Sequence, residues 1–458
     1  MTAILSFRSG GIGMMRQIAL GAALFALSGM VAEAATLRVV AVTGDVAPGT
    51  GGATYASFNA PALNDVGETA FRALLTGGGV TTANNVGIFT SRGLAAREGD
   101  VAPGTDSAVF ISPGAPALNN TGETAFTGLL SGAGVTGANN GGIFTTGVGL
   151  VAREGDVAPG TGGATYSRFD NPALNDAGET AFRGFLSGVG VTMANDSGIF
   201  ASSGLVAREG DESPDTAGAT YSGFGFPVRN EVGETAFRGF LSGAGVTGNN
   251  NEGIFTSSGL VAREGDVAPG TGGATYSSFV DGLSLNDAGK AAFQAFLIGA
   301  SVTGANNVGI FTDSGVVARE GNVAPGTGGA TFSAFGSPAL NNAGETAFSA
   351  NLTGAGVTGA NNSALFLSDR LGEVSLLARE GDVLDLGAGD QRTLNTISFF
   401  NGLNAAGDVA FLATFTDFSS AILVLEADGM ARIPVPGSLP LLLAGLAAFG
   451  LIRRRTRG

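Results

Sequence analysis

The sequence predicts an all-β protein, a seven-bladed β-propeller of four-stranded blades with an N-terminal signal and a C-terminal transmembrane sorting helix. Three observations predict the propeller. The composition combines 78 Gly, 31 Phe and 44% hydrophobic residues with 13% charged residues, which is typical of a turn-rich globular chain with a large core. Two motifs recur in register about every 55 residues. Each unit also contains four short β-prone runs, the content of one propeller blade.

The repeat is defined by two motifs that are found independently of one another. The first is GDVAPGT and its variants, whose acidic position is held by Asp45, Asp100, Asp156, Asp211, Asp266, Asn322 and Asp382. The second is N-x-x-G-x-x-A-F, which begins at Asn64, Asn119, Asn175, Asn230, Asn286, Asn341 and Asn404. Together they predict a propeller over residues 35–433, with units at about 46–100, 101–156, 157–211, 212–266, 267–322, 323–382 and 383–433.

The third unit illustrates the predicted blade. Its β-prone runs lie near residues 165–169, 179–186, 198–201 and 205–208, and clusters of Gly, Asn, Asp and Ser separate them. The Asn-x-x-Gly segment predicts a tight turn, because Asn can bond nearby backbone and Gly accepts a positive φ. We interpret the motif as a packing rule of the repeat. A β-solenoid, whose coils repeat at about 20 to 30 residues, and a chain of small sandwiches fit this unit poorly.

The N-terminal run from Leu37 to Val42 aligns with the fourth strand of the other units, although no earlier strands precede it. We predict that it completes the seventh blade, which would remove an open sheet edge and join the two ends of the ring.

Residues 1–34 have the three parts of a secretory signal. Arg8 and Arg16 supply the basic region, residues 18–31 the apolar run, and residues 32–34 an A-x-A site that predicts cleavage between Ala34 and Ala35. This predicts export by the Sec machinery and processing by signal peptidase. The start codon remains open between Met1, Met14 and Met15.

The C-terminal residues 434–458 predict a membrane-sorting tail. An apolar stretch over 439–452 is long enough, with the residues before it, to cross a bilayer. The basic cluster that follows should stay in the cytoplasm, and it comprises Arg453, Arg454, Arg455 and Arg457. The bulk of the chain would then lie outside.

The motif Pro434-Val435-Pro436-Gly437, the apolar span and the Arg cluster together resemble the PEP-CTERM class of bacterial sorting tails, in its VPLPA-type variant. Val435 and Gly437 depart from the usual Leu and Ala. The resemblance implies processing by an exosortase-type membrane enzyme during delivery to the cell surface or extracellular matrix of a Gram-negative bacterium. A plain tail anchor without processing is the alternative.

The N-x-x-G-x-x-A-F units resemble the bacterial tandem-repeat proteins named after this motif, which commonly carry such tails. The resemblance covers nearly the whole exported body. It implies a tandem-repeat architecture and a destination outside the cytoplasm, and it implies no catalytic residue and no cofactor.

Charge and residue types exclude several functions. Export and tail processing would leave 17 of the 23 basic residues and 37 of the 38 acidic ones, a net charge near −20. Such a surface disfavours nucleic acid and anionic lipid as partners. The chain has no Cys, His or Trp, so disulfides, thiolate nucleophiles, Cys/His metal sites and Ser-His-Asp arrangements are excluded.

The predicted binding face is the one that carries the GDVAPGTGGAT and SGAGVTGANN loops, because loops on a rigid scaffold commonly carry function. Calcium is the first ligand to consider there, since carboxylates and amide oxygens are its preferred ligands. The candidate carboxylates are Asp100, Asp156, Asp266 and Asp382, with Asn139, Asn140, Asn306 and Asn307 near them. The competing interpretation is that each Asp caps its own Gly turn.

Arg-Glu pairs end the fourth strand of six units, beginning with Arg97-Glu98, and we expect them to be solvated charges on an outer edge strand. If the protein were an enzyme, its catalytic residues should lie where the sequence departs from the repeat. Those departures are Glu212-Ser213-Pro214-Asp215, Lys290, Asp385 and Asp390-Gln391-Arg392.

Three functions remain open. The first is a non-catalytic surface or matrix protein, with extracellular polysaccharide as its expected ligand. The second is a calcium-dependent adhesin, and the third is a glycan-active hydrolase or lyase.

Overall fold

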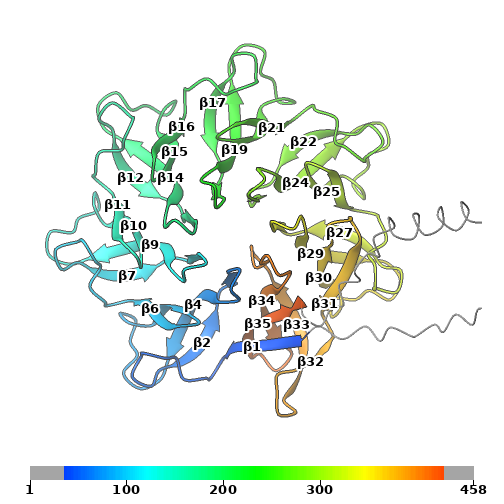
Figure 1. Cartoon of the computed structure of the whole chain (residues 1–458), viewed down its shortest axis with the longest axis horizontal. Helices are drawn as coiled ribbons and strands as arrows, with labels where there is room; N and C mark the ends of the chain where they lie inside the picture. The colour runs from blue at the N-terminus through cyan, green and yellow to red at the C-terminus, as the bar shows by residue number, and fades with distance from the viewer. Residues whose placement is uncertain (1–35, 428–458) are drawn as a thin grey trace, which may run out of the picture. The chain divides into compact units, whose positions relative to one another are not determined.

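The structure, a computed structural model, describes residues 36–427. Over this range the chain is all-β, and its seven antiparallel sheets form the ring of a seven-bladed propeller (Figure 1). Residues 36–427 contain no helix with the length and hydrophobicity needed to span a membrane. The predicted signal with its cleavage site at Ala34 and Ala35, and the predicted sorting tail at 434–458, lie outside the described residues.

Blades one to six share one plan of four strands, of which the first is split into two pieces. The main pieces of the first strands are β2 (Thr54–Phe58), β7 (Val109–Pro113), β12 (Thr165–Phe169), β17 (Thr220–Phe224), β22 (Thr275–Phe279) and β27 (Thr331–Phe335). The short second pieces are β3 (Ala62–Leu63), β8 (Ala117–Leu118), β13 (Ala173–Leu174), β18 (Val228–Arg229), β23 (Ser284–Leu285) and β28 (Ala339–Leu340). Both pieces pair with the second strand.

The remaining strands of these blades follow in chain order. The second strands are β4 (Thr69–Thr76), β9 (Thr124–Ser131), β14 (Thr180–Ser187), β19 (Thr235–Ser242), β24 (Ala291–Ile298) and β29 (Thr346–Thr353). The third strands are β5 (Val86–Thr90), β10 (Gly141–Thr145), β15 (Ser197–Ala201), β20 (Glu252–Thr256), β25 (Val308–Thr312) and β30 (Ser363–Ser368). The fourth strands are β6 (Gly93–Arg97), β11 (Gly149–Arg153), β16 (Gly204–Arg208), β21 (Gly259–Arg263), β26 (Gly315–Arg319) and β31 (Val374–Arg379).

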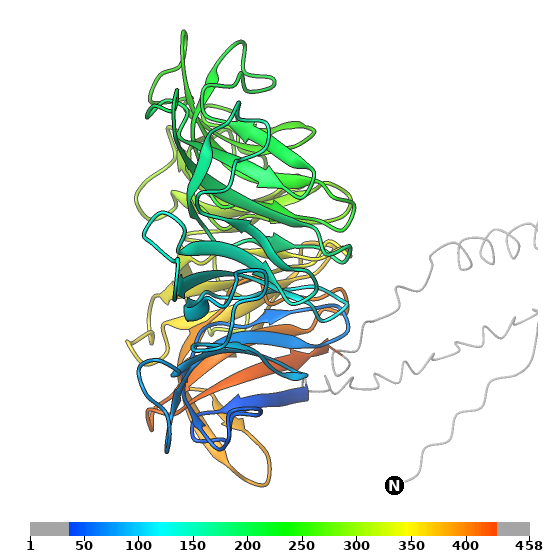
Figure 2. The same cartoon turned by 90° about the vertical axis from the view of Figure 1, so that its left-hand side faces the viewer.

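Blade seven is built from both ends of the described chain. Its first three strands are β33 (Gln391–Ser398), β34 (Val409–Phe415) and β35 (Ser420–Glu426), and β32 (Val383–Asp385) adds a hairpin to β33. Its fourth strand is β1 (Thr36–Val42), which pairs with β35 from Thr36 opposite Glu426 to Val42 opposite Ala421. Figures 1 and 2 both show β1 in dark blue beside the last strands. The predicted closure of the ring is confirmed.

The strand positions predicted for the third unit are confirmed to within one residue. The structure adds one feature, the two-residue strand β13, which pairs with the start of β14 after a bend at Asp170–Pro172. A β-bulge at Ser167 in β12 also shifts the register, so that Arg168 lies opposite Phe185.

The hydrophobic core lies between consecutive blades. The core between blades one and two contains Ile88 and Ala96 from blade one with Phe110, Phe126 and Phe144 from blade two. Equivalent clusters fill the junctions from blade two to blade six, and a further one between blades seven and one includes Ala41 of β1. Each blade therefore depends on both neighbours for burial of its apolar faces.

Candidate functional site

A closed ring of hydrogen bonds joins the Asn residues that begin the N-x-x-G-x-x-A-F motifs, here called the Asn ring. Asn64 Nδ2 donates to the carbonyl of Asn119 at 2.8 Å, and each following Asn repeats this bond to the next blade. Asn404 Nδ2 donates back to the carbonyl of Asn64 at 3.3 Å and closes the circle. All seven side chains are buried. The motif thus joins each blade to the next, in agreement with the prediction that it serves packing between the repeats.

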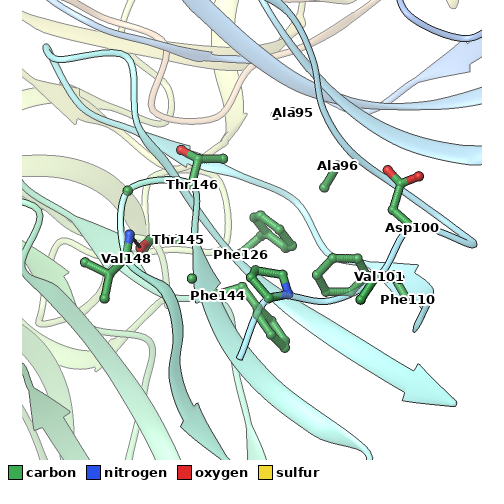
Figure 3. Close-up of a pocket in the computed structure, with 13 residues that line it drawn as sticks. Ala95, Ala96, Asp100, Val101, Phe110, Phe126, Phe144, Thr145, Thr146 and Val148 are labelled. Carbon is green, nitrogen blue, oxygen red and sulfur yellow. Dashed lines mark hydrogen bonds between the residues drawn. The ribbon is translucent and has the colours of Figure 1, made fainter. Parts of the chain in front are cut away.

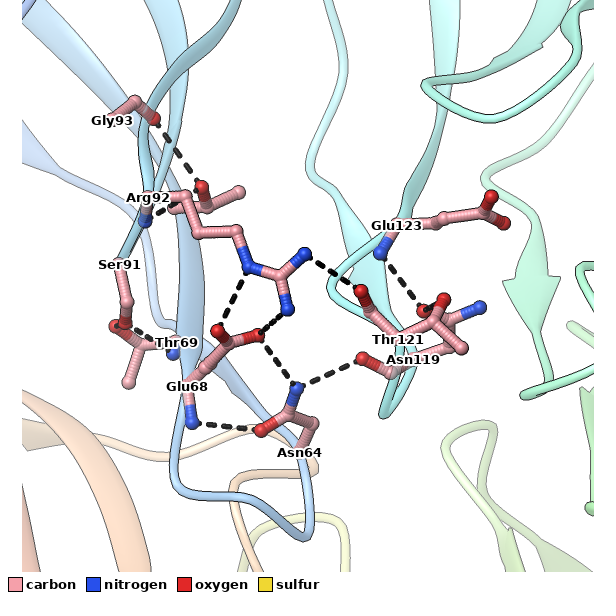
Figure 4. A network of polar contacts seen from close by, with 10 residues as sticks. Asn64, Glu68, Thr69, Ser91, Arg92, Gly93, Asn119, Thr121 and Glu123 are labelled. Carbon is pink, nitrogen blue, oxygen red and sulfur yellow. Dashed lines mark hydrogen bonds and ion pairs between the residues drawn. The ribbon is translucent and has the colours of Figure 1, made fainter.

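Each ring Asn also holds its own turn. In blade two the Oδ1 atom of Asn119 accepts from the backbone N–H of Glu123 at 2.8 Å, and Gly122 has a φ of 81° (Figure 4). Arg92 adds a cross-blade contact, because its guanidinium binds both carboxylate oxygens of Glu68 and donates to the carbonyl of Thr121 at 2.7 Å. The local turn was predictable, whereas the bond to the next blade was not.

A second, incomplete ring lies one residue further along each turn. The backbone N–H at this position donates to the side chain at the same position of the next blade, over 2.5 to 2.8 Å. The accepting side chains are Asn120, Asp176, Glu231, Asp287, Asn342 and Asp65. The seventh position is Ala405, which has no acceptor for the N–H of Asn342. Burial and the nearby Asp176, Asp287 and Asp65 carboxylates raise the pKa of Glu231.

The proposed calcium carboxylates lie one per blade junction, in the loops that join a fourth strand to the next first strand. Asp156, Asp266 and Asp382 each accept the backbone N–H of the Arg three residues earlier, at 2.7 to 2.9 Å. Each of them thus caps its own turn, and Asn139 and Asn306 likewise accept an N–H within their own loops. Within residues 36–427 no three Asp, Glu, His or Cys side chains gather closely enough to hold a metal ion.

Asp100 lines an open cleft of about 450 Å³ between blades one and two, with Val101 and the rings of Phe110 and Phe126 (Figure 3). A second cleft of about 570 Å³ lies on the other side of blade two and includes Asp156. Both are bordered by Val148, which belongs to a hairpin loop one residue longer than that of blade three. Each cleft presents a single carboxylate.

The expectation that the Arg-Glu pairs are solvated edge charges was wrong for the glutamates. Each fourth strand ends at the Arg, so the Glu lies in the turn after it, where it is buried to 4–8% exposure. Glu98 Oε2 accepts the backbone N–H groups of Asn85 and Val86 at 3.1 and 3.0 Å, and the other five glutamates bind the same loop in their blades. Arg97 Nε donates to the carbonyl of Asn84. The pairs therefore fasten the loop between the second and third strands.

Burial raises the pKa of most of these glutamates above its ordinary value. Desolvation is the main cause for Glu98, Glu209, Glu264, Glu320 and Glu380, and backbone N–H bonds oppose it. For Glu209 the adjacent Asp196 carboxylate raises the pKa further.

The loop residues predicted to break the repeat do not form one site. Ser213 is buried and bonds Thr216 and the carbonyl of Ala219 within its own loop. Lys290 is exposed in a turn of the Asn ring. Asp390 and Arg392 form an ion pair at 2.8 Å in blade seven, which holds the pKa of Asp390 below its ordinary value. These residues lie in blades four, five and seven.

Three neighbouring strand positions carry different side chains from blade to blade, and together they form one layer of side chains on the sheet. The first-strand position holds Ser57, Ser112, Arg168, Gly223, Ser278, Ala334 and Thr396. The first of two second-strand positions holds Arg72, Thr127, Arg183, Arg238, Gln294, Ser349 and Leu412. The second of them, two residues later, holds Leu74, Leu129, Phe185, Phe240, Phe296, Asn351 and Thr414. The residue just before the first of the two second-strand positions is a buried Phe in every blade, as at Phe71 and Phe182. Because one scaffold accepts all these side chains, the fold does not dictate which of them a blade carries.

In blades three and four this layer and the adjacent bend form a stack of alternating cations and rings, here called the Arg–Phe ladder: Arg168, Phe185, Arg183 and Phe226. The Arg168 guanidinium carbon lies 4.0 Å from the centroid of the Phe185 ring. The Arg183 guanidinium carbon lies 5.1 Å from the centroids of both Phe185 and Phe226. The ladder gathers two cations and two aromatic rings on a strongly acidic protein, and it is the candidate binding site.

The junction of blades four and five carries a different polar group. Arg238 pairs with Glu252 at 2.8 Å and lies 3.6 Å from Asp281. Glu252 also accepts from the N–H of Phe279 and the hydroxyl of Ser278. Two carboxylates therefore flank one largely buried guanidinium, an arrangement that general acid–base chemistry can use.

Sequence reasoning missed the ladder because it searched loops for departures from the repeat. The available signal was in the strands, where Arg168 replaces Ser, Gly, Ala or Thr and Phe226 replaces Ala60 and Ala115.

Comparison with known proteins identifies a family whose model matches this chain four times. A family model described as "Family of unknown function (DUF7453)" matches residues 26–148, 95–259, 146–315 and 256–437. No curated protein sequence matches the chain.

Similar solved structures include an oligogalacturonate lyase in complex with manganese, 10% identical with a TM-score of 0.40, covering 86% of this chain and 98% of that one. The Dos1 propeller is 8% identical with a TM-score of 0.36, covering 86% and 95% of the two chains. A Trypanosoma rangeli sialidase in complex with sialic acid is 8% identical with a TM-score of 0.28, covering 91% and 60%.

Proposed function

This chain belongs to the DUF7453 family of unknown function, and from its own features we propose that it is an exported, exosortase-sorted binding propeller of the cell surface or extracellular matrix. Its role is non-catalytic, and its ligand is an extracellular polysaccharide. The Arg–Phe ladder is the observation that carries the binding role, because neither the core nor ring closure needs those side chains.

The proposed route rests on the two terminal segments together with the closure of the ring. Cleavage between Ala34 and Ala35 would leave β1 intact, since this strand begins at Thr36. Thr36 pairs with Glu426, so the two ends of the described range lie beside each other in blade seven. Both segments could therefore be cut without removing a strand from the ring, as expected of a protein released by signal peptidase and an exosortase-type enzyme.

The resemblance of the repeats to N-x-x-G-x-x-A-F proteins supports the same destination. The Asn ring gives that motif a purely structural purpose, which fits a scaffold better than a catalyst. We therefore place function in the positions that vary between blades.

The proposal is tested by adding the purified protein to an array of bacterial and plant polysaccharides, with release of sugar ends measured on every glycan that binds. Retention of one glycan class without chain cleavage is the expected result. Absence of binding across the array would overturn the polysaccharide role. Cleavage would favour the hydrolase or lyase, and loss of that cleavage in Glu252→Gln would assign it to the Arg238 group.

The route is tested by expressing the chain in its host with an internal tag. We expect the mature protein to begin at Ala35 and to lack the Arg cluster when the exosortase-type enzyme is present. Retention of the tail in both backgrounds would favour the plain membrane anchor.

A further inference from the structure

We propose that the Arg–Phe ladder recognises a sugar that bears a carboxylate, with Arg168 binding the carboxylate and Phe226 packing against the apolar face of the sugar ring. This inference rests on the polysaccharide-binding role proposed above and assigns its ligand class and its site.

Arg168 is the cation that the ladder presents to solvent. Its side chain is 63% exposed, and its ion pair to Asp170 is long, at 3.9 Å. Its guanidinium forms no hydrogen bond with any residue in the range 36–427. Its guanidinium carbon lies 4.0 Å over the centroid of the Phe185 ring, a contact that restrains the group while its N–H groups make no hydrogen bond. A planar fork of this kind matches a carboxylate, which it can bind through two parallel hydrogen bonds.

Arg183 is the cation that supports the site. Its Nε donates to Asp170, and it also donates to the carbonyl of Phe224 in the next blade. Its side chain is only 19% exposed. Asp170 is therefore already neutralised by Arg183, and the charge of Arg168 remains available to a ligand. The ladder together with Asp170 thus carries one net positive charge.

Phe226 supplies the apolar surface. It is 45% exposed and occupies a bend where blades one and two have Ala60 and Ala115. A half-exposed aromatic ring at a position that tolerates Ala is not explained by core packing. The C–H groups on one face of a pyranose are apolar, so covering this ring with a sugar removes apolar area from water on both partners.

The charge of the whole body favours a sugar with isolated carboxylates over a dense polyanion. Nucleic acid binding draws on several phosphate contacts and weakens steeply with salt. The ladder offers one guanidinium without a close ion pair, that of Arg168, within an exported body whose charge is near −20. At 0.15 M salt the Debye length is about 8 Å, so the distant carboxylates are screened while a direct contact to Arg168 persists.

The repeat supplies substitutions that the fold already accepts. Arg168→Ser installs the residue found at the same position in blades one, two and five, and Phe226→Ala installs that of blades one and two. Arg92→Ser is the matched control, because Arg92 is also exposed, at 56%, and blades three and four have Ser203 and Ser258 in its place. All three variants are first compared with the parent protein by melting temperature.

Binding is measured by calorimetry in 0.15 M NaCl with trisaccharides that contain a single galacturonate or a single glucuronate, and with their neutral methyl esters. We expect at least one acidic trisaccharide to bind the parent, and its ester to bind about tenfold or more weakly, because the charged hydrogen bonds are lost. Arg168→Ser should lower affinity for the acid to that of the ester and make the two equal. Phe226→Ala should weaken acid and ester alike, and Arg92→Ser should change neither.

Preserved acid selectivity in Arg168→Ser, or an equal loss in Arg92→Ser, would overturn the assignment. Binding of only neutral glycans, unaffected by Arg168→Ser, would overturn this inference while leaving the polysaccharide role intact. Binding of single-stranded DNA in preference to both sugars would overturn it as well. Failure of every glycan on the array would instead reject the proposed function from which the inference starts.

Discussion

Single buried asparagines carry the contacts between blades at the centre of the ring. Each Asn joins its own turn to the next blade through one side chain, and the seven bonds return to their starting point. A buried donor or acceptor that loses its partner costs more than a hydrogen bond contributes on average. The ring should therefore be sensitive to substitution at any of its members.

Asn119→Ala tests this sensitivity. The change removes the bond to the carbonyl of Asn175 and the bonds accepted from Glu123 and Thr121. We expect the free energy of unfolding to fall by about 1 to 3 kcal/mol in urea denaturation, because the N–H of Glu123 loses the Asn119 oxygen and the carbonyl of Asn175 keeps only its bond from Gly178. Asn139→Ala is the control, since the Asn139 side chain bonds only within its own loop. Equal effects of the two changes would contradict the structural role of the ring.

Ala405→Asn tests the gap in the second ring. An Asn at this exposed position offers an oxygen to the N–H of Asn342, as its counterparts do in the other blades. We expect a gain of about 0.5 to 1.5 kcal/mol in the free energy of unfolding. Ala405→Leu has a side chain of similar size without an acceptor and should give no gain. A gain with Leu would show that burial, not the hydrogen bond, is responsible.

The buried glutamates predict how stability depends on pH. Their folded pKa is raised above the unfolded value, so the folded state binds protons more readily than the unfolded state. Stability should therefore be highest below the unfolded pKa and fall as pH rises from that value through the raised folded pKa. Melting temperatures measured from pH 4.5 to 8 should decline toward neutral pH.

Glu209→Gln isolates one contribution to this pH dependence. The amide oxygen can still accept the N–H groups of Asp196 and Ser197, and the repulsion from the Asp196 side chain disappears. We expect higher stability at pH 7 and a flatter pH profile. Glu212→Gln, in an exposed loop, should leave the profile unchanged.

At the scale of the strand and the blade, repetition made the fold predictable. The same runs and turns recur seven times, so a local preference too weak to define one strand becomes clear when the units are aligned. The two-residue strands such as β13 were missed, because a bend containing Pro172 interrupts the first strand before it resumes. Glu98 was misplaced because the strand ends one residue before it.

The candidate site was beyond prediction for a related reason. Arg168 lies opposite Phe185 only because of the bulge at Ser167, and simple alternation along the strand does not reveal that register. Phe226 meets Arg183 across the junction of two blades, a contact that no pattern within one unit contains.

Deletion of residues 35–43 tests the closing strand. Without β1, the third strand of blade seven becomes an exposed edge, and the contacts of Arg38 with Glu426 and with the carbonyl of Gly67 are lost. We expect the melting temperature to fall by about 10 °C or more, or the protein to aggregate. A chain that begins at Ala35 is the control and should melt as the parent does. Unaltered cooperative melting of the deletion variant would contradict the closure.

At the scale of the whole molecule, the acidic surface opposes compactness. A body of charge near −20 repels itself, and added salt should screen that repulsion. We expect the melting temperature to rise between 0.02 and 0.5 M NaCl. CaCl₂ at matched ionic strength, compared with EGTA-treated protein, separates screening from specific binding. A much larger rise with calcium would support the calcium-dependent adhesin.

Ring closure by β1 also has a consequence for the order of events during delivery. If the chain crosses the membrane from its N-terminus, as we propose, β1 emerges first and its partner β35 emerges near the end, more than 370 residues later along the chain. Blades one to six can assemble in between, while the backbone N–H and C=O groups of β1 remain without the partner strand β35. The exposed edge of β1 is therefore covered only when β35 has been exported. A chain that stalls before that point would keep an unpaired strand, which a chaperone or a protease could bind.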